Sequence, residues 1–393
     1  MTVSSSSTSP APTSTVVSQK AIVVFALAGL ALICFGAYSY GGERQSGAVL
    51  IGGLAGLALY HASFGFTAAW RHIVTERRGG GLRAQFVLIL LTSAVAFPLI
   101  AWGSDFGWPT GGFVFPFGYA AAIGAFMFGL GMQLGGGCAS GTLFTAGGGS
   151  TRMMVTLAAF ILGSVIATAH MHLWGQLPKI PAYSLVTNFG PIVAFAITAL
   201  VLGLIALATL KIEKRAHGRI LEGRKTGSIL TGPWSPMLGA GMLAFVCILT
   251  FVVVGRPWGI TSGFALWGAK VFQVIGIPVE TWPYWKWQTK ALEASVLRDT
   301  TSVMNFGIIF GALSAAALAG KFYLVWRLST KDLLTAIIGG LLMGYGARLA
   351  YGCNIGAYLG GLVSGSMHGW LWLVFAFAGS LLGTRLRLKL GMG

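Results

Sequence analysis

Hydrophobic residues occur in long runs along this chain, separated by charged and proline-containing stretches. Most runs approach the roughly 20 residues that an α-helix needs to cross a bilayer. Shorter glycine-rich runs are typical of re-entrant half-helices, whose backbone must be satisfied by surrounding protein. The pattern predicts an all-α integral membrane protein, a helical bundle of about ten spans and four half-helices. The spans are expected at 21–40, 47–60, 84–102, 117–136, 153–174, 189–210, 237–254, 303–319, 333–350 and 367–383, and the half-helices at 61–70, 137–148, 255–270 and 352–365.

The composition excludes a water-soluble globular domain. Apolar residues make up 55% and charged residues 9% of the 393 positions, against about 25% charged residues in soluble domains. The net charge of +17 does not predict nucleic-acid binding, because the basic residues lie in loops between apolar runs. Residues 1–20 are rich in Ser and Thr and have no basic residue before Lys20. We expect a disordered tail rather than a cleavable signal peptide.

The loops share the basic residues unequally. Of 26 Lys and Arg residues, 18 fall at Lys20 and in the alternate loops 71–83, 148–152, 211–236, 320–332 and 384–393. Because loops rich in Lys and Arg remain in the cytoplasm, this side is predicted to be cytoplasmic and to carry both termini. The basic segment from Arg256 to Arg298 on the other side weakens the bias.

An internal repeat organises the chain. Residues 129–141 (GLGMQLGGGCASG) match 344–356 (GYGARLAYGCNIG) at a constant offset of 215, with six of thirteen positions identical. A Gly-x-Thr motif also occurs twice, at 65–67 and 259–261. The number of spans between the motifs makes the halves inverted copies, which in transporters place a substrate site at the repeat interface. The expected units are the tail 1–20, a first span and loop 21–46, repeat A 47–188, a linking span and basic loop 189–236, and repeat B with a basic tail 237–393.

Cys138 and Cys353 occupy matching positions in the repeat. A buried cysteine is usually a small hydrophobic residue, and we expect no more of Cys34 and Cys247, which have no repeat partner. The matched pair is a candidate site, because two thiols at the repeat interface offer polarizable sulfur and weak S–H donors to a sulfur-containing substrate. The cysteines form no CxxC or zinc-type spacing, and no cofactor or metal is predicted.

Arg348 is a charge inside a predicted span, where an arginine is costly and usually functional. Its repeat mate is the neutral amide Gln133, as expected if an anion is held mainly from one side. The alternative is that Arg348 extends to the outer headgroups from its place near the end of the span. The other residues predicted to bind substrate are the hydroxyls of Thr67 and Thr261 and the glycines before the two cysteines, Gly137 and Gly352.

Acidic residues are absent from the predicted spans and occur only in loops or at span ends. We therefore expect no buried carboxylate that could relay protons or sodium. No Walker A motif occurs, so ATP is not expected to be used within the chain. The inverted repeats with paired half-helices, an architecture characteristic of transporters, favour a permease over an enzyme.

The Gly-Gly-Cys-Ala-Ser-Gly-Thr stretch at 136–142, the Tyr-Gly-Cys-Asn-Ile-Gly stretch at 351–356 and the doubled Gly-x-Thr motif resemble the YeeE/YedE family of sulfur-transport membrane proteins. The resemblance covers about residues 47–383. It implies uptake of thiosulfate or a related inorganic sulfur species across the bacterial inner membrane, passed along pore cysteines that Cys138 and Cys353 match. It also implies a cytoplasmic thiol sulfur-carrier protein (TusA-like) as partner. Gly65 stands where family members with three pore cysteines have the third.

Other functions remain open from the residues alone. The chain could carry a different anion, such as a selenium or sulfite-like species. It could be a membrane thiol sulfurtransferase in which Cys138 or Cys353 becomes persulfidated, with Arg348 as the only nearby group to lower a thiol pKa. A non-catalytic membrane scaffold is a third reading, but it gives the matched cysteines no role.

Overall fold

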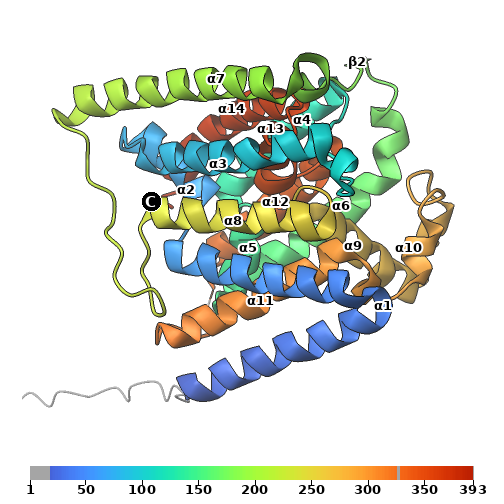
Figure 1. Ribbon diagram of the computed structural model, residues 1–393. Helices are drawn as coiled ribbons and strands as arrows, with labels where there is room; N and C mark the ends of the chain where they lie inside the picture. Colours follow the sequence, from blue (N-terminus) through green and yellow to red (C-terminus); the bar gives the residue numbers. More distant parts are fainter. Residues whose placement is uncertain (1–17, 325–327, 393) are drawn as a thin grey trace, which may run out of the picture.

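The computed structural model describes residues 18–324 and 328–392, so most of the predicted tail at 1–20 lies outside the described residues. The described fold is helical apart from one short two-stranded ribbon (Figure 1). The long helices are α1 (Gln19–Ala62), α3 (Gly80–Trp102), α4 (Tyr119–Gly135), α6 (Thr151–Trp174), α7 (Leu185–His217), α8 (Pro236–Val254), α11 (Thr300–Leu318), α12 (Thr330–Leu349) and α14 (Met367–Lys389). The shorter elements are α2 (Phe66–Thr75), η1 (Gly103–Phe106), β1 (Phe117–Gly118), α5 (Ala139–Gly147), β2 (Lys179–Ile180), α9 (Thr261–Val274), η2 (Val279–Thr281), α10 (Thr289–Glu293), η3 (Val296–Arg298), η4 (Asn354–Leu359) and α13 (Gly360–Leu362).

Nine stretches of the described residues are helical, long and apolar enough to cross a membrane. The predicted all-α membrane protein is therefore confirmed. The first stretch contains a reversal in α1, where Gly41 and Gly42 leave helical geometry and Gly42 has a φ of +60°. The two arms are tied together, since the Ser46 hydroxyl donates to the Cys34 carbonyl oxygen at 3.0 Å. This reversal makes the first two predicted spans the two arms of one element.

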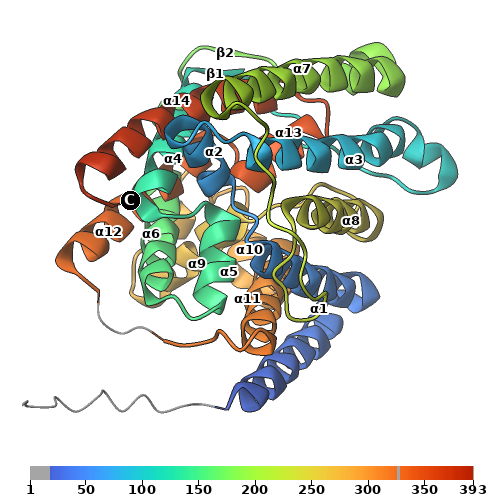
Figure 2. The same cartoon turned by 90° about the vertical axis from the view of Figure 1, so that its left-hand side faces the viewer.

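The four predicted half-helices are short helices inside the bundle. They begin at Phe66 (α2), Ala139 (α5), Thr261 (α9) and Asn354 (η4), and Figure 2 shows α2, α5 and α9 among the longer helices. Every residue of η4, a short π-helix, is buried. Burial in protein is the condition under which a broken helix is tolerated at membrane depth.

Glycines let the longest helices approach closely. A Cβ on Gly56 of α1 would overlap the Ile308 carbonyl oxygen of α11, and a Cβ on Gly311 of α11 would overlap a backbone oxygen of α1. In the same way, a Cβ on Gly129 of α4 would overlap the Ala376 carbonyl oxygen of α14. Backbone contact through small residues is how membrane helices associate without a hydrophobic driving force.

The two halves repeat each other's helix contacts. Helix α4 packs on α14 as α12 packs on α6, and α1 packs on α11 as α8 packs on α3. The matched helices α4 and α12 run antiparallel, because Gly124 lies against Leu349 while Gly131 lies against Gly339. Two equivalent helices that pack antiparallel are related by a two-fold axis perpendicular to them. Because both helices are membrane spans, this axis lies in the plane of the membrane. The fold therefore contains the predicted inverted repeat.

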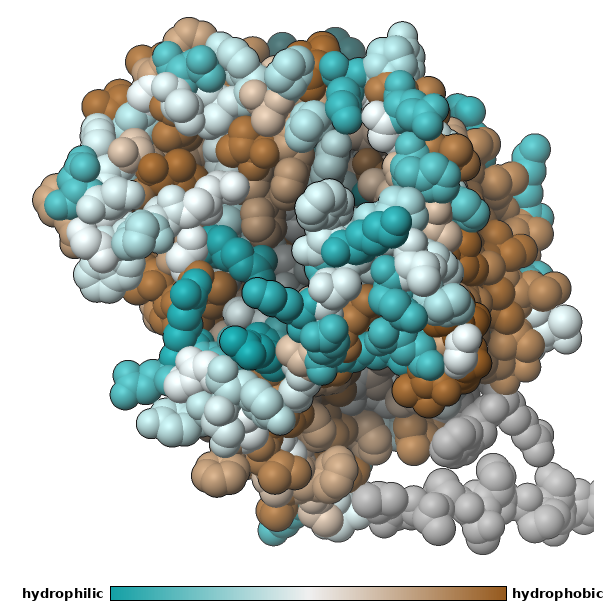
Figure 3. Space-filling model, turned by 90° about the vertical axis from the view of Figure 1, so that its right-hand side faces the viewer, coloured by the Kyte–Doolittle hydropathy of each residue, from teal (hydrophilic) through white to brown (hydrophobic). Residues whose placement is uncertain are grey.

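The connecting segments gather at two ends of the bundle. One end, called here the α7–α8 end, joins 76–79, 148–150 and 218–235, where Arg78 donates to the Glu222 carbonyl oxygen at 3.3 Å. The opposite end, the α10 end, carries the ribbon and the turn of α1, and Gln45 donates there to the Leu297 carbonyl oxygen at 2.9 Å. Figure 3 shows the α10 end, where hydrophilic side chains surround a depression and hydrophobic side chains cover the flank.

One acidic residue corrects an expectation from the sequence. Glu213, near the end of α7, is buried, with a relative exposure of 1%. Its carboxylate pairs with Arg83 at 2.7 Å and accepts from the backbone N–H groups of Gly79 and Leu221. The expectation of no buried carboxylate is therefore wrong for this position. Since Glu213 is fully engaged at the α7–α8 end, it contributes to structure there.

Candidate functional site

Helix α4 breaks immediately before Cys138. Gly136 ends the helix with a φ of +89°, a conformation that glycine adopts without strain. Cys138 then occupies the position before the first residue of α5 and is buried, with a relative exposure of 1%. Its Sγ lies 3.4 Å from the Ser140 hydroxyl, and the Thr142 hydroxyl donates to its carbonyl oxygen at 2.8 Å. The break thus places the first turn of a new helix, α5, beside the Cys138 thiol.

Helix α12 breaks in the same way before Cys353. Gly352 has a φ of +153°, and a Cβ there would lie 2.9 Å from the Ala357 nitrogen, so a larger residue would strain the turn. Cys353 precedes η4, is completely buried, and accepts from the Ile355 N–H at 3.4 Å. Both glycines predicted beside the cysteines therefore lie in the breaks. For Gly137 a Cβ would meet ordinary contacts, 3.4 Å from Gly141.

The two breaks come together in the interior. Half-helices α5 and η4 contact each other, and Cys138 and Cys353 belong to the same buried cluster. Unfilled space lies next to Cys353, because a Cβ on the buried Gly356 would meet no atom within 4 Å. At the matching Gly141, a Cβ would lie 3.5 Å from the Cys138 sulfur. The repeat-matched glycines keep the surroundings of the thiols open.

Gln133 and Arg348 make equivalent links in the two repeats. The Gln133 amide donates to the Thr67 carbonyl oxygen at 3.0 Å and to the Ser380 hydroxyl at 2.8 Å. Arg348 donates to the Thr261 hydroxyl at 2.8 Å. In each repeat, the residue five positions before the cysteine therefore holds the start of the Gly-x-Thr half-helix. The Thr67 hydroxyl and the Gln133 amide oxygen are buried and have no hydrogen-bond partner among the described residues.

Arg348 turns into the protein from the last turn of α12. Besides Thr261, it contacts the Tyr284 hydroxyl at 3.4 Å, and its buried Nε has no partner within the described ranges. An arginine whose side chain extended to the lipid headgroups would not bond to the start of α9. The Arg348 side chain does bond there, to Thr261. The guanidinium group therefore provides a positive charge beside α9 with donor capacity to spare.

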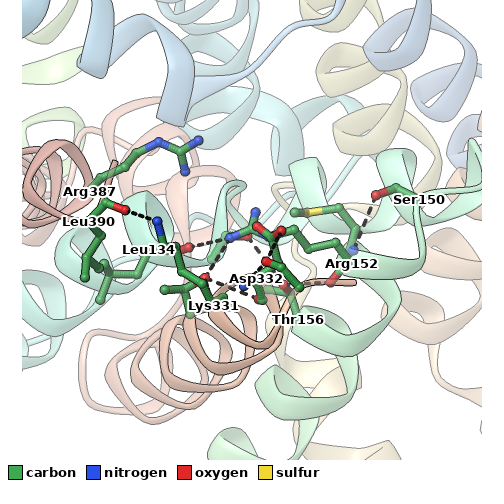
Figure 4. A network of polar contacts seen from close by, with 12 residues as sticks. Leu134, Ser150, Arg152, Thr156, Lys331, Asp332, Arg387 and Leu390 are labelled. Atoms are coloured by element: carbon green, nitrogen blue, oxygen red, sulfur yellow. Dashed lines mark hydrogen bonds and ion pairs between the residues drawn. The ribbon is translucent and has the colours of Figure 1, made fainter. Parts of the chain in front are cut away.

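Two arginines hold the end of α4 in front of the first break, and Figure 4 shows the contacts of one of them, Arg152. Arg152 donates to the carbonyl oxygens of residues 134 and 135 at 2.9 and 3.1 Å, and its Nε lies 3.3 Å from an Asp332 carboxylate oxygen. Arg387 donates to the Gln133 carbonyl oxygen at 3.1 Å. Cations at a helix C-terminus satisfy its free carbonyl groups and complement its dipole. These contacts fix the end of α4 from which the segment carrying Cys138 departs.

A family model described as sulphur transport matches residues 61–382, which include both breaks and both Gly-x-Thr motifs. The chain belongs to the sulphur-transport family. This confirms the resemblance inferred from the sequence motifs.

Several curated proteins are similar to this chain. Thiosulfate transporter TsuA of Escherichia coli is 25% identical over 84% of this chain and 91% of its own length. Thiosulfate transporter TsuA of Spirochaeta thermophila is 33% identical over 66% of this chain and 74% of its own length. Probable transporter YedE of Escherichia coli is 33% identical, but the match spans only 38% of that protein.

A cavity of about 340 Å³ opens at the α7–α8 end of this family member. Gly65, the residue before α2, lines it together with His72, Arg78 and Arg224. Arg224 donates to the Ala62 carbonyl oxygen at 2.6 Å and thereby ties the 218–235 segment to the end of α1. Gly65, where the sequence lacks a third motif cysteine, therefore lies on a wall of this cavity.

Sequence reasoning missed several polar residues near the breaks. Tyr284, the partner of Arg348, comes from a segment far away in the sequence, and no local pattern marks it. Asn354 and Tyr358 follow Cys353 directly on η4 and are completely buried. A signal for them existed, since the aligned positions in the other repeat are the apolar Ala139 and Leu143.

Proposed function

We propose that this protein is a permease that imports thiosulfate, or a related small inorganic sulfur anion, across the bacterial inner membrane. Family membership and the name of the TsuA relatives, thiosulfate transporters, support a sulfur-anion cargo. The observation that carries the mechanism is the pair of repeat-related thiols, Cys138 and Cys353, which begin two contacting half-helices.

The two thiols would form a narrow contact point for the terminal sulfur of the anion. A neutral thiol is a weak donor and a polarizable acceptor, so each contact would be strong enough to guide the sulfur and weak enough to release it. Conduction through a filter requires this balance of binding and release. Gly137 and Gly352 would let the backbone approach the substrate closely at each thiol.

The oxygen end of the anion would contact the polar groups that hold the Gly-x-Thr half-helices. Arg348 has a charged donor left over, and Gln133, Thr67 and Thr261 supply neutral groups. One cation at one repeat and one neutral amide at the other would attract the anion from one side without trapping it between two charges. The arrangement suits a small anion better than a neutral substrate.

We further propose that the α7–α8 end faces the cytoplasm, since most basic loops fall there. A membrane potential of −100 mV then opposes entry of a dianion by about 4.6 kcal/mol, at about 2.3 kcal/mol per charge. Consumption of the anion inside the cell would keep its internal concentration low, and the resulting concentration gradient would offset this free energy. A small cytoplasmic thiol sulfur-carrier protein of the TusA kind is the proposed partner for that step.

Growth on thiosulfate as the sole sulfur source tests this function. A sulfur-auxotrophic host that lacks its own transporters should grow when it expresses the wild type and fail with Cys138→Ala or Cys353→Ala. Cys34→Ala and Cys247→Ala are matched controls, since both cysteines lie in ordinary spans, and they should support growth. Equal growth with all four variants would refute the cysteine mechanism.

Covalent trapping separates the permease from a sulfurtransferase. During uptake, mass spectrometry of the permease should find Cys138 and Cys353 unmodified. A persulfide that accumulates on either thiol in step with turnover would instead establish the enzyme.

A further inference from the structure

A group of buried polar atoms beside Cys353 has no hydrogen-bond partner among the residues that the structure describes. It consists of the Asn354 amide, the Tyr358 hydroxyl and the Trp372 indole N–H. Their side chains are at most 1% exposed. A buried donor without an acceptor loses its hydrogen bonds to water without replacement, so native proteins rarely keep one without a reason.

Ring contacts join these residues to the start of α2. The Tyr358 ring stacks on Trp372 with centroids 6.0 Å apart and an interplanar angle of 12°. It also meets the edges of Phe66 at 6.1 Å and Trp70 at 6.0 Å. Asn354 lies four residues before Tyr358 on the same short helix, directly after Cys353. Tyr358 and Trp372 therefore pack together against α2, and Asn354 lies nearby on the half-helix that Cys353 precedes.

Two comparisons within the chain indicate that the fold itself does not need these donors. In the other repeat, the residues aligned with Asn354 and Tyr358 are Ala139 and Leu143, and they build the equivalent half-helix α5. Within the cluster, the Trp70 indole does have a partner, the Gln85 amide oxygen at 3.0 Å. The indole of Trp372, in the same cluster, therefore differs from that of Trp70 in having no partner among the described residues.

We infer that Asn354, Tyr358 and Trp372 form an uncharged binding site for the oxygen atoms of a small sulfur or selenium oxyanion next to Cys353. Such an anion only accepts hydrogen bonds, so it would satisfy all three donors at once. Neutral donors bind an anion without a full opposing charge, which allows its release in the next step. The unfilled space at Gly356 lies on the same half-helix. The inference rests on the proposed transport of a sulfur anion and adds the residues that select its oxygen end.

Substitutions that remove a donor test the site, and Tyr358→Phe does so while it keeps the ring. In Tyr358→Phe, the unfolding temperature of the purified, ligand-free protein should stay the same or rise, since an unsatisfied group has gone. Trp372→Phe also loses buried ring volume, so its unfolding temperature should fall. The KM for thiosulfate uptake into proteoliposomes should rise by about tenfold or more, and the thermal shift produced by thiosulfate should shrink. The matched control is Tyr345→Phe, whose hydroxyl does have partners, at 3.1 Å to His170 and 2.9 Å to Trp174. It should lower the unfolding temperature and leave KM unchanged.

The outcomes separate this inference from the proposed function. Wild-type KM and thermal shift in Tyr358→Phe and Trp372→Phe, with thiosulfate transport intact, would overturn the site and leave the permease standing. If the wild type transports no thiosulfate, thermal shifts with sulfite, sulfate and selenite decide the matter. A shift that the wild type shows with one of these anions and both variants lose would support the site for that anion. No shift of the wild type with any of them would overturn it.

Discussion

Filling the space beside Cys353 with one methyl group should stabilise the protein and slow transport. Gly356 has no positive φ, and a Cβ there would meet no atom within 4 Å, so Gly356→Ala introduces no clash. Alanine in place of a helical glycine stabilises by about 0.5–1 kcal/mol. If the anion passes through this space, the same methyl group narrows its path. We expect a loss of flux of about tenfold, which corresponds to about 1.4 kcal/mol.

The assay pairs thermal unfolding with initial rates of radiolabelled thiosulfate uptake into proteoliposomes at a clamped voltage. Gly241→Ala on α8 is the matched control, since a Cβ there also meets no atom within 4 Å and the residue lies outside the breaks. The control should gain similar stability and keep its flux. Wild-type flux in Gly356→Ala, with the control behaving as expected, would refute the assignment of this space to the path.

Three further substitutions test charge and packing. Arg348→Gln removes a charged donor and should raise the KM for thiosulfate uptake about 10- to 100-fold. This range follows from the roughly 1.5–3 kcal/mol that a charge-assisted hydrogen bond contributes. An unchanged KM would exclude Arg348 from the path. Gly129→Ala should lower the yield of folded protein on size-exclusion chromatography, because its Cβ overlaps the Ala376 carbonyl oxygen and overpacking costs about 1–3 kcal/mol or more; a wild-type yield would contradict the close contact. Glu213→Ala leaves Arg83 without its buried partner and should lower the free energy of chemical unfolding by about 3–5 kcal/mol. A decrease of less than about 1 kcal/mol would show that the ion pair is solvated.

Hydropathy and glycine placement were sufficient to predict the helical membrane fold, because membrane spans and half-helices differ in length and in backbone demands. The helix boundaries, in contrast, could not be predicted accurately from the sequence. The first half-helix was expected at 61–70, but α1 ends where Ser63 adopts a φ of +46°, and α2 begins only at Phe66. A left-handed serine leaves no mark in the hydropathy pattern. The spans of α1, likewise, are one element whose reversal depends on Gly41 and Gly42.

The internal repeat also allowed most residues of the candidate site to be predicted from the sequence. Aligned motifs marked Cys138 and Cys353, and the structure places them on contacting half-helices. The contact of Arg348 with Tyr284 could not be predicted, because Tyr284 belongs to a distant segment that only the tertiary fold brings close. Buried polar atoms without partners, such as those of Asn354, are defined only once every neighbouring group has a position.

Voltage-clamped uptake by purified cysteine variants tests the central claim most directly. In a protein carrying Cys34→Ala and Cys247→Ala, the two repeat-matched thiols are the only ones left, and thiosulfate flux should equal that of the wild type. Adding Cys138→Ser or Cys353→Ser should each abolish most of the flux without lowering the unfolding temperature. Full flux with both serines in place would contradict the account.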